Sequence, residues 1–263
     1  VLQNSGQSTY EALQATLERR FSSGISLQAS FAWQKNITDA DSILPGINGG
    51  TQQIQNPDNL RQEKAISIQD IPLVFTVAYL YELPFGKGKK FLSGSNIASS
   101  VLGGWQVGGV QRYQSGEPIA FGCAQGIPGW DNCIRFNRVP GQSPLSDAAK
   151  SGHFDPFASR YYNPAAFVDP NLNRNGGAYQ FGNYPRVNSD VRMKPYYNED
   201  FSIIRNFSVR EGISVQLKGE LLNAFNRHIF SRPDTGPNSP NFGLVTGTID
   251  GPRNVQFTLR VNF

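Results

Sequence analysis

Few residues of the 263-residue chain have the types and spacing that catalysis requires. The two histidines, His153 and His228, lie in different predicted loops, and no group of histidines and cysteines with metal-ligand spacing surrounds them. We therefore expect no catalytic residue, no metal site and no bound cofactor, and we expect that the protein is not an enzyme.

Two pairs of carboxylates remain as candidates for acid–base or metal chemistry. Glu199 and Asp200 could flank a glycosidic bond, but neighbours in a strand point to opposite faces. Asp39 and Asp41 fall on one side of an extended segment, as calcium ligands do, but no fuller ligand set follows them. We expect Glu199 and Asp200 to have a structural role or to carry charge in the barrel lumen.

The only cysteines, Cys123 and Cys133, lie ten residues apart in a stretch rich in glycine and proline. In an exported protein this spacing favours a disulfide within one loop, whereas in a reducing compartment the two thiols would be free. The disulfide would order that loop rather than hold the whole fold together.

The elements that position these residues are strands with a two-residue period. In the last eleven residues, Val255, Phe257, Leu259, Val261 and Phe263 alternate with polar residues, which puts the two sets on opposite faces. Similar runs predict seven strands, near 10–21, 25–35, 71–83, 104–114, 197–207, 213–225 and 253–263. Strands of roughly 10–14 residues, tilted by about 45°, cross about 25 Å of hydrocarbon. Strands of soluble proteins are nearer 5–6 residues.

Composition narrows the class of protein. Mean hydropathy is −0.39 and no apolar stretch approaches about 20 residues, which excludes a helical membrane protein. The net charge is +4, but the cations are mostly scattered, so nucleic acid is not an expected partner. The chain has no signal peptide and no methionine at Val1, and we expect it to start inside a longer or processed precursor.

The connections between the expected strands alternate between short and long. Residues 22–24 and 208–212 are short, residues 84–102 are intermediate, and the long loops are 36–70, 115–196 and 226–252. Outer-membrane barrels have short periplasmic turns and long extracellular loops, whereas a soluble sandwich has no reason to sort its loops. The sequence thus predicts an all-β fold, an antiparallel transmembrane β-barrel meander surrounded by outer-membrane lipid.

Aromatic residues on the apolar faces cluster at both ends of these strands. Two girdles are expected where the barrel meets the membrane interfaces. The outer girdle would contain Trp33, Tyr113, Tyr197 and Phe225, and the inner girdle Phe21, Tyr81, Trp105, Phe207 and Phe263. The general preference of aromatic residues for strands explains their presence but not their placement.

Five segments, spaced along the whole chain, carry a family resemblance. They are Tyr10 to Phe21, Tyr81 to Lys89, Gly103 to Gly108 with Tyr113 to Gly116, Gly219 to Asn226, and Pro252 to Phe263. Together they resemble the C-terminal barrel of TonB-dependent outer-membrane receptors, in particular the Oar-like group with a carboxypeptidase-regulatory-like N-terminal domain.

The resemblance implies about the last seven strands of a larger barrel of about 22 strands in the bacterial cell outer membrane. It also implies an N-terminal plug and the remaining barrel strands, both absent here, and a TonB complex that drives import through the missing N-terminal part. Phe263 resembles the signal read by the barrel-assembly machinery. We expect deletion of Phe263 to lower assembly, with little effect on molecules already inserted.

Ligand recognition is expected in the outer loops, because loops on a rigid scaffold carry function. In the longest loop, the candidate contacts to an unidentified extracellular ligand are Trp130, Tyr161, Tyr162 and Tyr179. The alternative is that these aromatic residues pack a small core that keeps the loop ordered. Three functions stay open: TonB-linked uptake, a structural or adhesive outer-membrane protein, and a soluble all-β carbohydrate-binding module.

Overall fold

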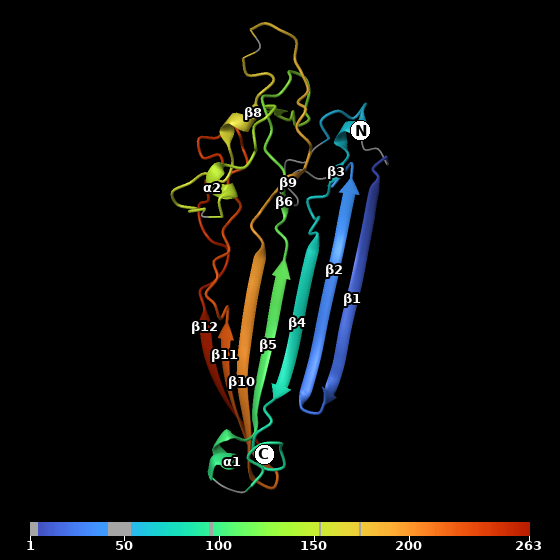
Figure 1. The fold of residues 1–263 in the computed structure, drawn as a ribbon. Helices are drawn as coiled ribbons and strands as arrows, with labels where there is room; N and C mark the ends of the chain where they lie inside the picture. The colour runs from blue at the N-terminus through green and yellow to red at the C-terminus, as the bar shows by residue number, and fades with distance from the viewer. Residues whose placement is uncertain (1–4, 42–53, 95–96, 153, 174) are drawn as a thin grey trace.

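Seven long antiparallel strands dominate the computed structural model, which describes residues 5–41, 54–94, 97–152, 154–173 and 175–263 (Figure 1). They are β1 (Ser8–Ser22), β2 (Ile25–Thr38), β4 (Leu73–Glu82), β5 (Trp105–Gln114), β10 (Tyr196–Arg210), β11 (Ile213–Leu222) and β12 (Asn254–Asn262). Each strand pairs with the next long strand along the chain, and the short β3 (Ala65–Ile66) extends the pairing of β2. The predicted all-β meander is therefore confirmed.

Local residue types set the strand ends. Between β1 and β2, Ser23 and Gly24 both have positive φ, 54° and 82°, as a two-residue hairpin turn requires. β11 ends at Leu222 instead of near residue 225, because Asn223 adopts a φ of 48° and starts a turn. Asparagine tolerates this left-handed conformation better than most residues.

The register aligns the apolar residues of all seven strands on one face of the sheet, called here the apolar face. One row across the sheet runs from Phe31 to Phe75, Tyr113 and Tyr197, each paired with the next. No second sheet covers this face in the described residues, and Phe257 stays 84% exposed. A soluble sandwich would bury such residues in a shared core.

The opposite face of the sheet carries polar pairs. Lys218 and Glu220 form an ion pair of 2.7 Å, and Gln216 Nε2 donates to Asn206 Oδ1 at 2.9 Å. A wet barrel lumen accommodates such groups, whereas lipid does not. The two faces thus differ as the alternation of the sequence predicts.

The long and short connections lie at opposite ends of the sheet (Figure 1). The outer end carries the long connections, and the inner end carries the short turns, the helix α1 (Ile97–Leu102) and the C-terminus. This is the sorting that the loop lengths predict. No helix in the described ranges is long and apolar enough to span a membrane.

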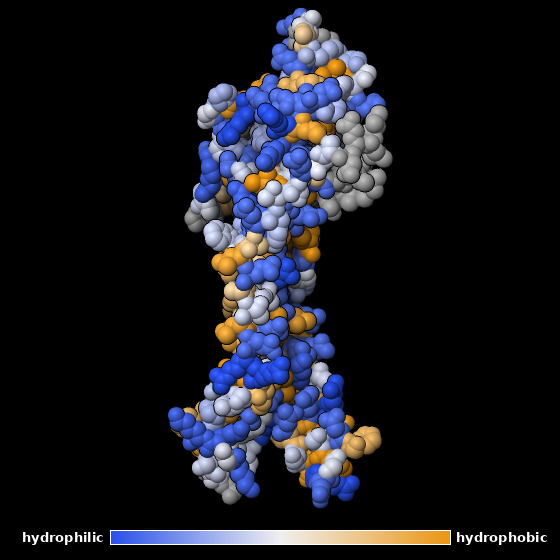
Figure 2. Space-filling view, turned by 90° about the vertical axis from the view of Figure 1, so that its right-hand side faces the viewer, coloured by the Kyte–Doolittle hydropathy of each residue, from blue (hydrophilic) through white to orange (hydrophobic). Residues whose placement is uncertain are grey.

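The long connections fold together into one unit, called here the outer-loop domain, which comprises residues 54–70, 115–152, 154–173, 175–195 and 223–253. Its short elements are η1 (Leu60–Glu63), β6 (Pro118–Ile119), β7 (Asn137–Arg138), α2 (Asp147–Lys150), η2 (Pro164–Ala166), β8 (Phe167–Val168) and β9 (Asn188–Arg192). Figure 2 shows a wide, mostly hydrophilic head above a narrow stalk along which hydrophobic residues recur. The main buried core of the described residues lies in this domain.

Candidate functional site

The outer-loop domain is organised around a cluster of aromatic rings. The ring of Phe121 lies 4.6 to 5.8 Å, between centroids, from the rings of Phe167, Tyr162, Tyr184 and Phe242. Phe242 comes from the connection between β11 and β12, so the core joins two loops that are distant in sequence. Edge-to-face packing of this kind adds about 0.5–1.5 kcal/mol per pair to the gain from burial.

Two of the four candidate ligand contacts belong to this core. Tyr162 is fully buried and Tyr161 is 8% exposed, and the Tyr161 hydroxyl donates to the Arg192 carbonyl at 2.9 Å. Tyr162 therefore offers no ring surface to a ligand, whereas Tyr161 also lines one of the hollows of this domain and stays a candidate contact. The alternative that the sequence left open, a small loop core, accounts for both.

The other two candidates lie nearer the surface. Trp130 is partly buried, with its Nε1 donating to the Gln55 carbonyl at 3.0 Å and its ring 5.5 Å from that of Phe181. Tyr179 is 36% exposed. Tyr179 thus keeps a ring surface that a ligand could reach, and Trp130 keeps part of one.

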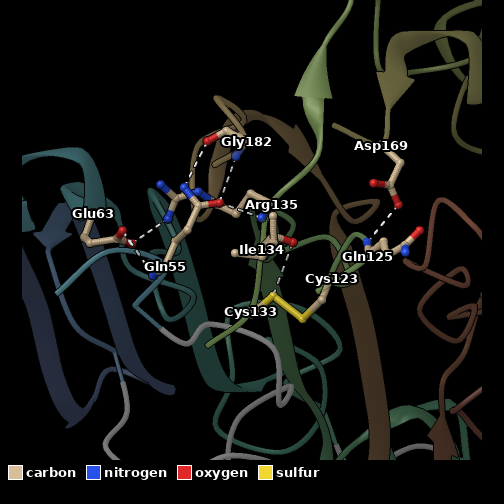
Figure 3. The surroundings of a disulfide bond; sticks show 9 residues. All are labelled: Gln55, Glu63, Cys123, Gln125, Cys133, Ile134, Arg135, Asp169 and Gly182. Carbon is tan, nitrogen blue, oxygen red and sulfur yellow. Dashed lines mark hydrogen bonds and ion pairs between the residues drawn. A yellow bond between two sulfur atoms is a disulfide. The ribbon is translucent and has the colours of Figure 1, made fainter. Parts of the chain in front are cut away.

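A disulfide joins Cys123 and Cys133, whose Cα atoms lie 5.2 Å apart (Figure 3). Next to it, the backbone N–H of Ala124 donates to the carbonyl of Ile134 at 2.7 Å. The pairing expected from the sequence is thus present, and it closes the loop that carries Trp130.

Three ion pairs connect Asp41 and residues 54–70 to the longest loop, and in each pair the longest loop supplies the arginine. Glu63 pairs with Arg135 at 2.5 Å, Asp70 pairs with Arg192 at 2.5 Å, and Asp41 pairs with Arg186. The acid side chains are 0 to 3% exposed. Charges buried this deeply are tolerated only when they are paired, so the two loops are complementary in charge.

Gln55 completes this contact as a fully buried side chain. Its Oε1 accepts from the backbone N–H groups of Arg135 and Gly182 at 2.7 and 3.1 Å, and its Nε2 donates to the Gly182 carbonyl at 3.0 Å (Figure 3). A side chain at position 182 would place Cβ 1.8 Å from the Arg135 carbonyl oxygen, so only glycine fits there. The two loops therefore form one rigid unit.

Where the strands meet this domain, three members of the expected outer girdle lie close together. The rings of Tyr113 and Tyr197 are 5.8 Å apart, and Arg227 lies 5.4 Å from the Tyr197 ring and 5.6 Å from the Phe225 ring. Arg227 also binds both carboxylate oxygens of Glu199, at 2.7 and 2.8 Å. Trp33, the fourth member, is 59% exposed on β2.

The pairing of Arg227 could have been inferred from the sequence, because an acidic residue on the apolar face needs a cation as its partner. Glu199 falls on the apolar face of β10, where a carboxylate without a partner would be costly. Its neighbour Asp200 instead accepts from the backbone N–H of Asn223 at 2.8 Å. The two carboxylates thus have separate partners, as expected for residues on opposite faces of a strand.

The inner end has the corresponding aromatic residues. Arg205 lies 5.2 Å from the Trp105 ring and 4.2 Å from the Phe207 ring, and Phe21, Tyr81 and Phe263 are exposed at the same end. Phe263 follows the last residue of β12 and is 99% exposed.

No group of three metal-ligating side chains occurs within the described ranges. Asp39 accepts from the backbone N–H of Gln7 at 2.7 Å, and Asp41 accepts from that of Ile68 at 3.3 Å, so both carboxylates have structural partners. His153 lies outside the described residues.

Two hollows in the described residues are lined wholly or mainly by the outer-loop domain. One, of about 460 Å³, is lined by Asn137, Leu172, Asn173, Gln180 and Asn238 together with Phe136 and Phe167. The other, of about 440 Å³, lies where the domain meets β5 and β10 and is lined mainly by apolar residues and Tyr161, with the charged or polar residues Glu117, Lys194, Arg227 and His228. Both are large enough for a small ligand.

Comparison with known families identifies the family of this chain. A family model described as an outer membrane beta barrel domain matches residues 1–256. The chain belongs to this family. A search of the curated proteins gave no match.

Membership in the outer membrane β-barrel family places the protein in the outer membrane. The apolar face of the sheet therefore meets lipid, which explains why Phe257, Leu259 and Trp33 stay exposed in the chain itself. The polar face lines the barrel interior.

Removing the disulfide is expected to loosen the outer-loop domain of this barrel. In the double variant Cys123→Ser/Cys133→Ser, the unfolded chain regains the conformational entropy that closing a loop of about ten residues removes. In the chain-entropy account this lowers the free energy of unfolding by about 2–3 kcal/mol. We expect faster proteolysis within residues 115–196 and unchanged heat-modifiable migration of the barrel. Proteolysis at the wild-type rate, without reductant, would contradict this.

Alkaline pH should destabilise the same domain. Burial raises the pKa of Tyr184 to about 12 and also raises the pKa of Tyr162, whereas an unfolded tyrosine ionises near pH 10. Between these values the unfolded chain releases protons that the folded domain retains, so the free energy of unfolding falls as pH rises. Below pH 10 these groups cause no change.

Near-ultraviolet circular dichroism with tyrosinate absorbance measures this transition. Tyr184→Phe should flatten the decrease above pH 10, while Tyr179→Phe, at an exposed position, should leave it as in the wild type. Equal slopes in all three proteins would show that Tyr184 does not control the alkaline transition.

Proposed function

We propose that this chain is the C-terminal part of the barrel of a TonB-dependent, Oar-like outer-membrane receptor, which takes up a ligand recognised by the outer-loop domain. The five segments that resemble this receptor group are spread along the whole chain. The proposal assigns the plug, the remaining strands and the TonB contact to the rest of the receptor.

The observation that carries the proposal is the open sheet. In the described residues, β1 and β12 each have a long partner strand on one side only. Lipid cannot satisfy the free backbone N–H and C=O groups of such an edge. Seven strands therefore need further strands to close around a lumen, which supports a larger barrel of the receptor type.

The construction of the outer-loop domain supports a role in recognition. Its buried ion pairs, its disulfide and its aromatic core hold three long connections in one arrangement above the sheet. A rigid outer surface of this kind lowers the entropic cost of binding. Tyr179, Trp130 and the two hollows are the candidate contacts.

A structural or adhesive role is the second candidate. It is favoured by apolar side chains that the outer-loop domain exposes, such as Phe157 at 81% and Leu172 at 56%. Such residues suit contact with another surface or protein. The two functions differ in their partners, because only import needs the TonB complex of the inner membrane.

Cross-linking to TonB separates the two functions. In cells that produce the full-length protein, we expect a photo-reactive residue in its N-terminal TonB-contacting segment to cross-link to TonB, and we expect the product to increase when ligand is present. A full-length protein that lacks a plug and gives no TonB cross-link would favour the structural or adhesive role and overturn the proposal.

A further inference from the structure

The connection between β4 and β5 differs from the other turns at the inner end because it contains a helix. Helix α1 leaves three large apolar side chains uncovered by the described part of the chain. Ile97 is 84% exposed, Val101 is 54% exposed and Leu102 is 50% exposed. Helix α1 itself contains no charged residue. The lysines of the same connection precede it in the sequence.

Two side chains of the apolar face hold the C-terminal end of α1. Trp105 Nε1 donates to the Val101 carbonyl at 3.1 Å, and Arg205 Nη2 donates to the Ser100 carbonyl. Trp105 and Arg205 are directly paired between β5 and β10, and both lie on the apolar face. The last carbonyls of a helix need such donors, and a cation is favourable there. Helix α1 is therefore attached on the side of the sheet that meets lipid.

The turn around α1 is closely packed within itself. At Gly103, a Cβ atom would lie 2.5 Å from the Ser99 carbonyl oxygen and 3.0 Å from the Cα atom of Gly86. Phe85 and Phe91 contact one another with ring centroids 5.8 Å apart. Together with the hydrogen bonds from Trp105 and Arg205, this packing presents the apolar side chains of α1 beside the inner aromatic girdle.

Cations accompany this apolar surface. Lys87, Lys89 and Lys90 lie in the same turn, with Lys89 paired to Glu82 at 2.8 Å and Lys90 5.4 Å from the Phe91 ring. Apolar side chains beside basic ones are the combination that binds the surface of a phospholipid layer. The inner leaflet of the outer membrane is the lipid layer at this height.

We propose that α1, with Trp105 and Arg205, is a lipid-binding foot that anchors the barrel in the inner leaflet of the outer membrane. Ile97, Val101 and Leu102 lie among the acyl chains next to the headgroups. Arg205 and the lysines of the turn face the phosphates. This role depends only on membership in the outer membrane β-barrel family and not on TonB-linked uptake.

Contact quenching tests the foot in the full-length protein reconstituted in phospholipid nanodiscs. A fluorescent maleimide is attached at Ile97→Cys, and acyl-chain-brominated phosphatidylcholine and phosphatidylglycerol replace the ordinary lipids. We expect bromination to lower the emission by about twofold, because the label sits in the interface. The matched control is Phe157→Cys, an 81% exposed position on the outer-loop domain, whose emission should not change.

Three outcomes would overturn the foot. The first is equal emission at position 97 in brominated and ordinary lipid. The second is full quenching at position 97 by aqueous iodide, which places α1 in water. The third is shielding from both quenchers, which places another part of the full-length protein over α1. Heat-modifiable migration shows that each labelled variant is folded, and Val101→Cys repeats the test should Ile97→Cys fail to fold.

Discussion

Replacing Glu63 with alanine is expected to destabilise the outer-loop domain by about 3–5 kcal/mol, because it leaves the buried charge of Arg135 without a partner. Glu63 is fully buried, with Arg135 Nη1 2.5 Å from its Oε2. Its Oε1 also accepts from the backbone N–H groups of Gln55 and Asn56 at 3.2 and 3.3 Å. The substitution therefore leaves one charge and two donors unsatisfied.

Thermal unfolding followed by near-ultraviolet circular dichroism measures this loss, since the aromatic core is in the same domain. The matched control is Asp147→Ala, which removes an ion pair of 2.7 Å to Lys150 whose acid side chain is 99% exposed. Exposed pairs contribute little, so the control should unfold as the wild type does. The double variant Glu63→Met/Arg135→Leu should regain the part of the loss that comes from the unpaired charge, but not the part that comes from the two backbone donors. A Glu63→Ala protein with the wild-type midpoint would show that the loops do not depend on this pair.

Placing arginine at Phe257 should cost about 2–4 kcal/mol of folding free energy in lipid, the range for a cation near the middle of the bilayer. Phe257 lies in the middle of β12, on the apolar face and opposite Gly219. Its 84% exposure in the chain alone becomes contact with lipid in the membrane. In water, an arginine at so exposed a position would cost almost nothing.

The comparison is with Gln256→Arg, one residue along the strand and on the polar face. Residue 256 lies opposite Glu220, so a cation there should be tolerated. The urea concentration at which half of the protein folds into lipid vesicles should fall for Phe257→Arg and stay near the wild-type value for Gln256→Arg. A similar decrease in both variants would mean that the two faces do not differ in environment.

The strands and their faces could be predicted because their signal is local. A two-residue period fixes which side chains share a face, and a slip of one residue would move every apolar side chain to the other face. The strand expected near 253–263 is β12 at Asn254–Asn262, and that near 104–114 is β5 at Trp105–Gln114. The error at the end of β11 came from Asn223, whose positive φ no alternation reveals.

The interior of the outer-loop domain could not be predicted, because its contacts join residues far apart in sequence. Glu63 and Arg135 are 72 residues apart, and Gln55 and Gly182 are 127 apart. Loop residues have no period, so nothing local distinguishes buried Tyr162 from exposed Tyr179. Helix α1 was missed for a related reason, since six residues are too few to show a helical period.

Cysteine accessibility along β12 tests the central claim most directly, namely that this strand crosses the outer membrane with one face in lipid and the other in the lumen. Single cysteines replace each residue from Val255 to Val261 in the full-length protein, and outer membranes are treated with a small water-soluble maleimide. We predict labelling at 256, 258 and 260 and protection at 255, 257, 259 and 261. Labelling at the odd positions equal to that at the even ones would contradict the account.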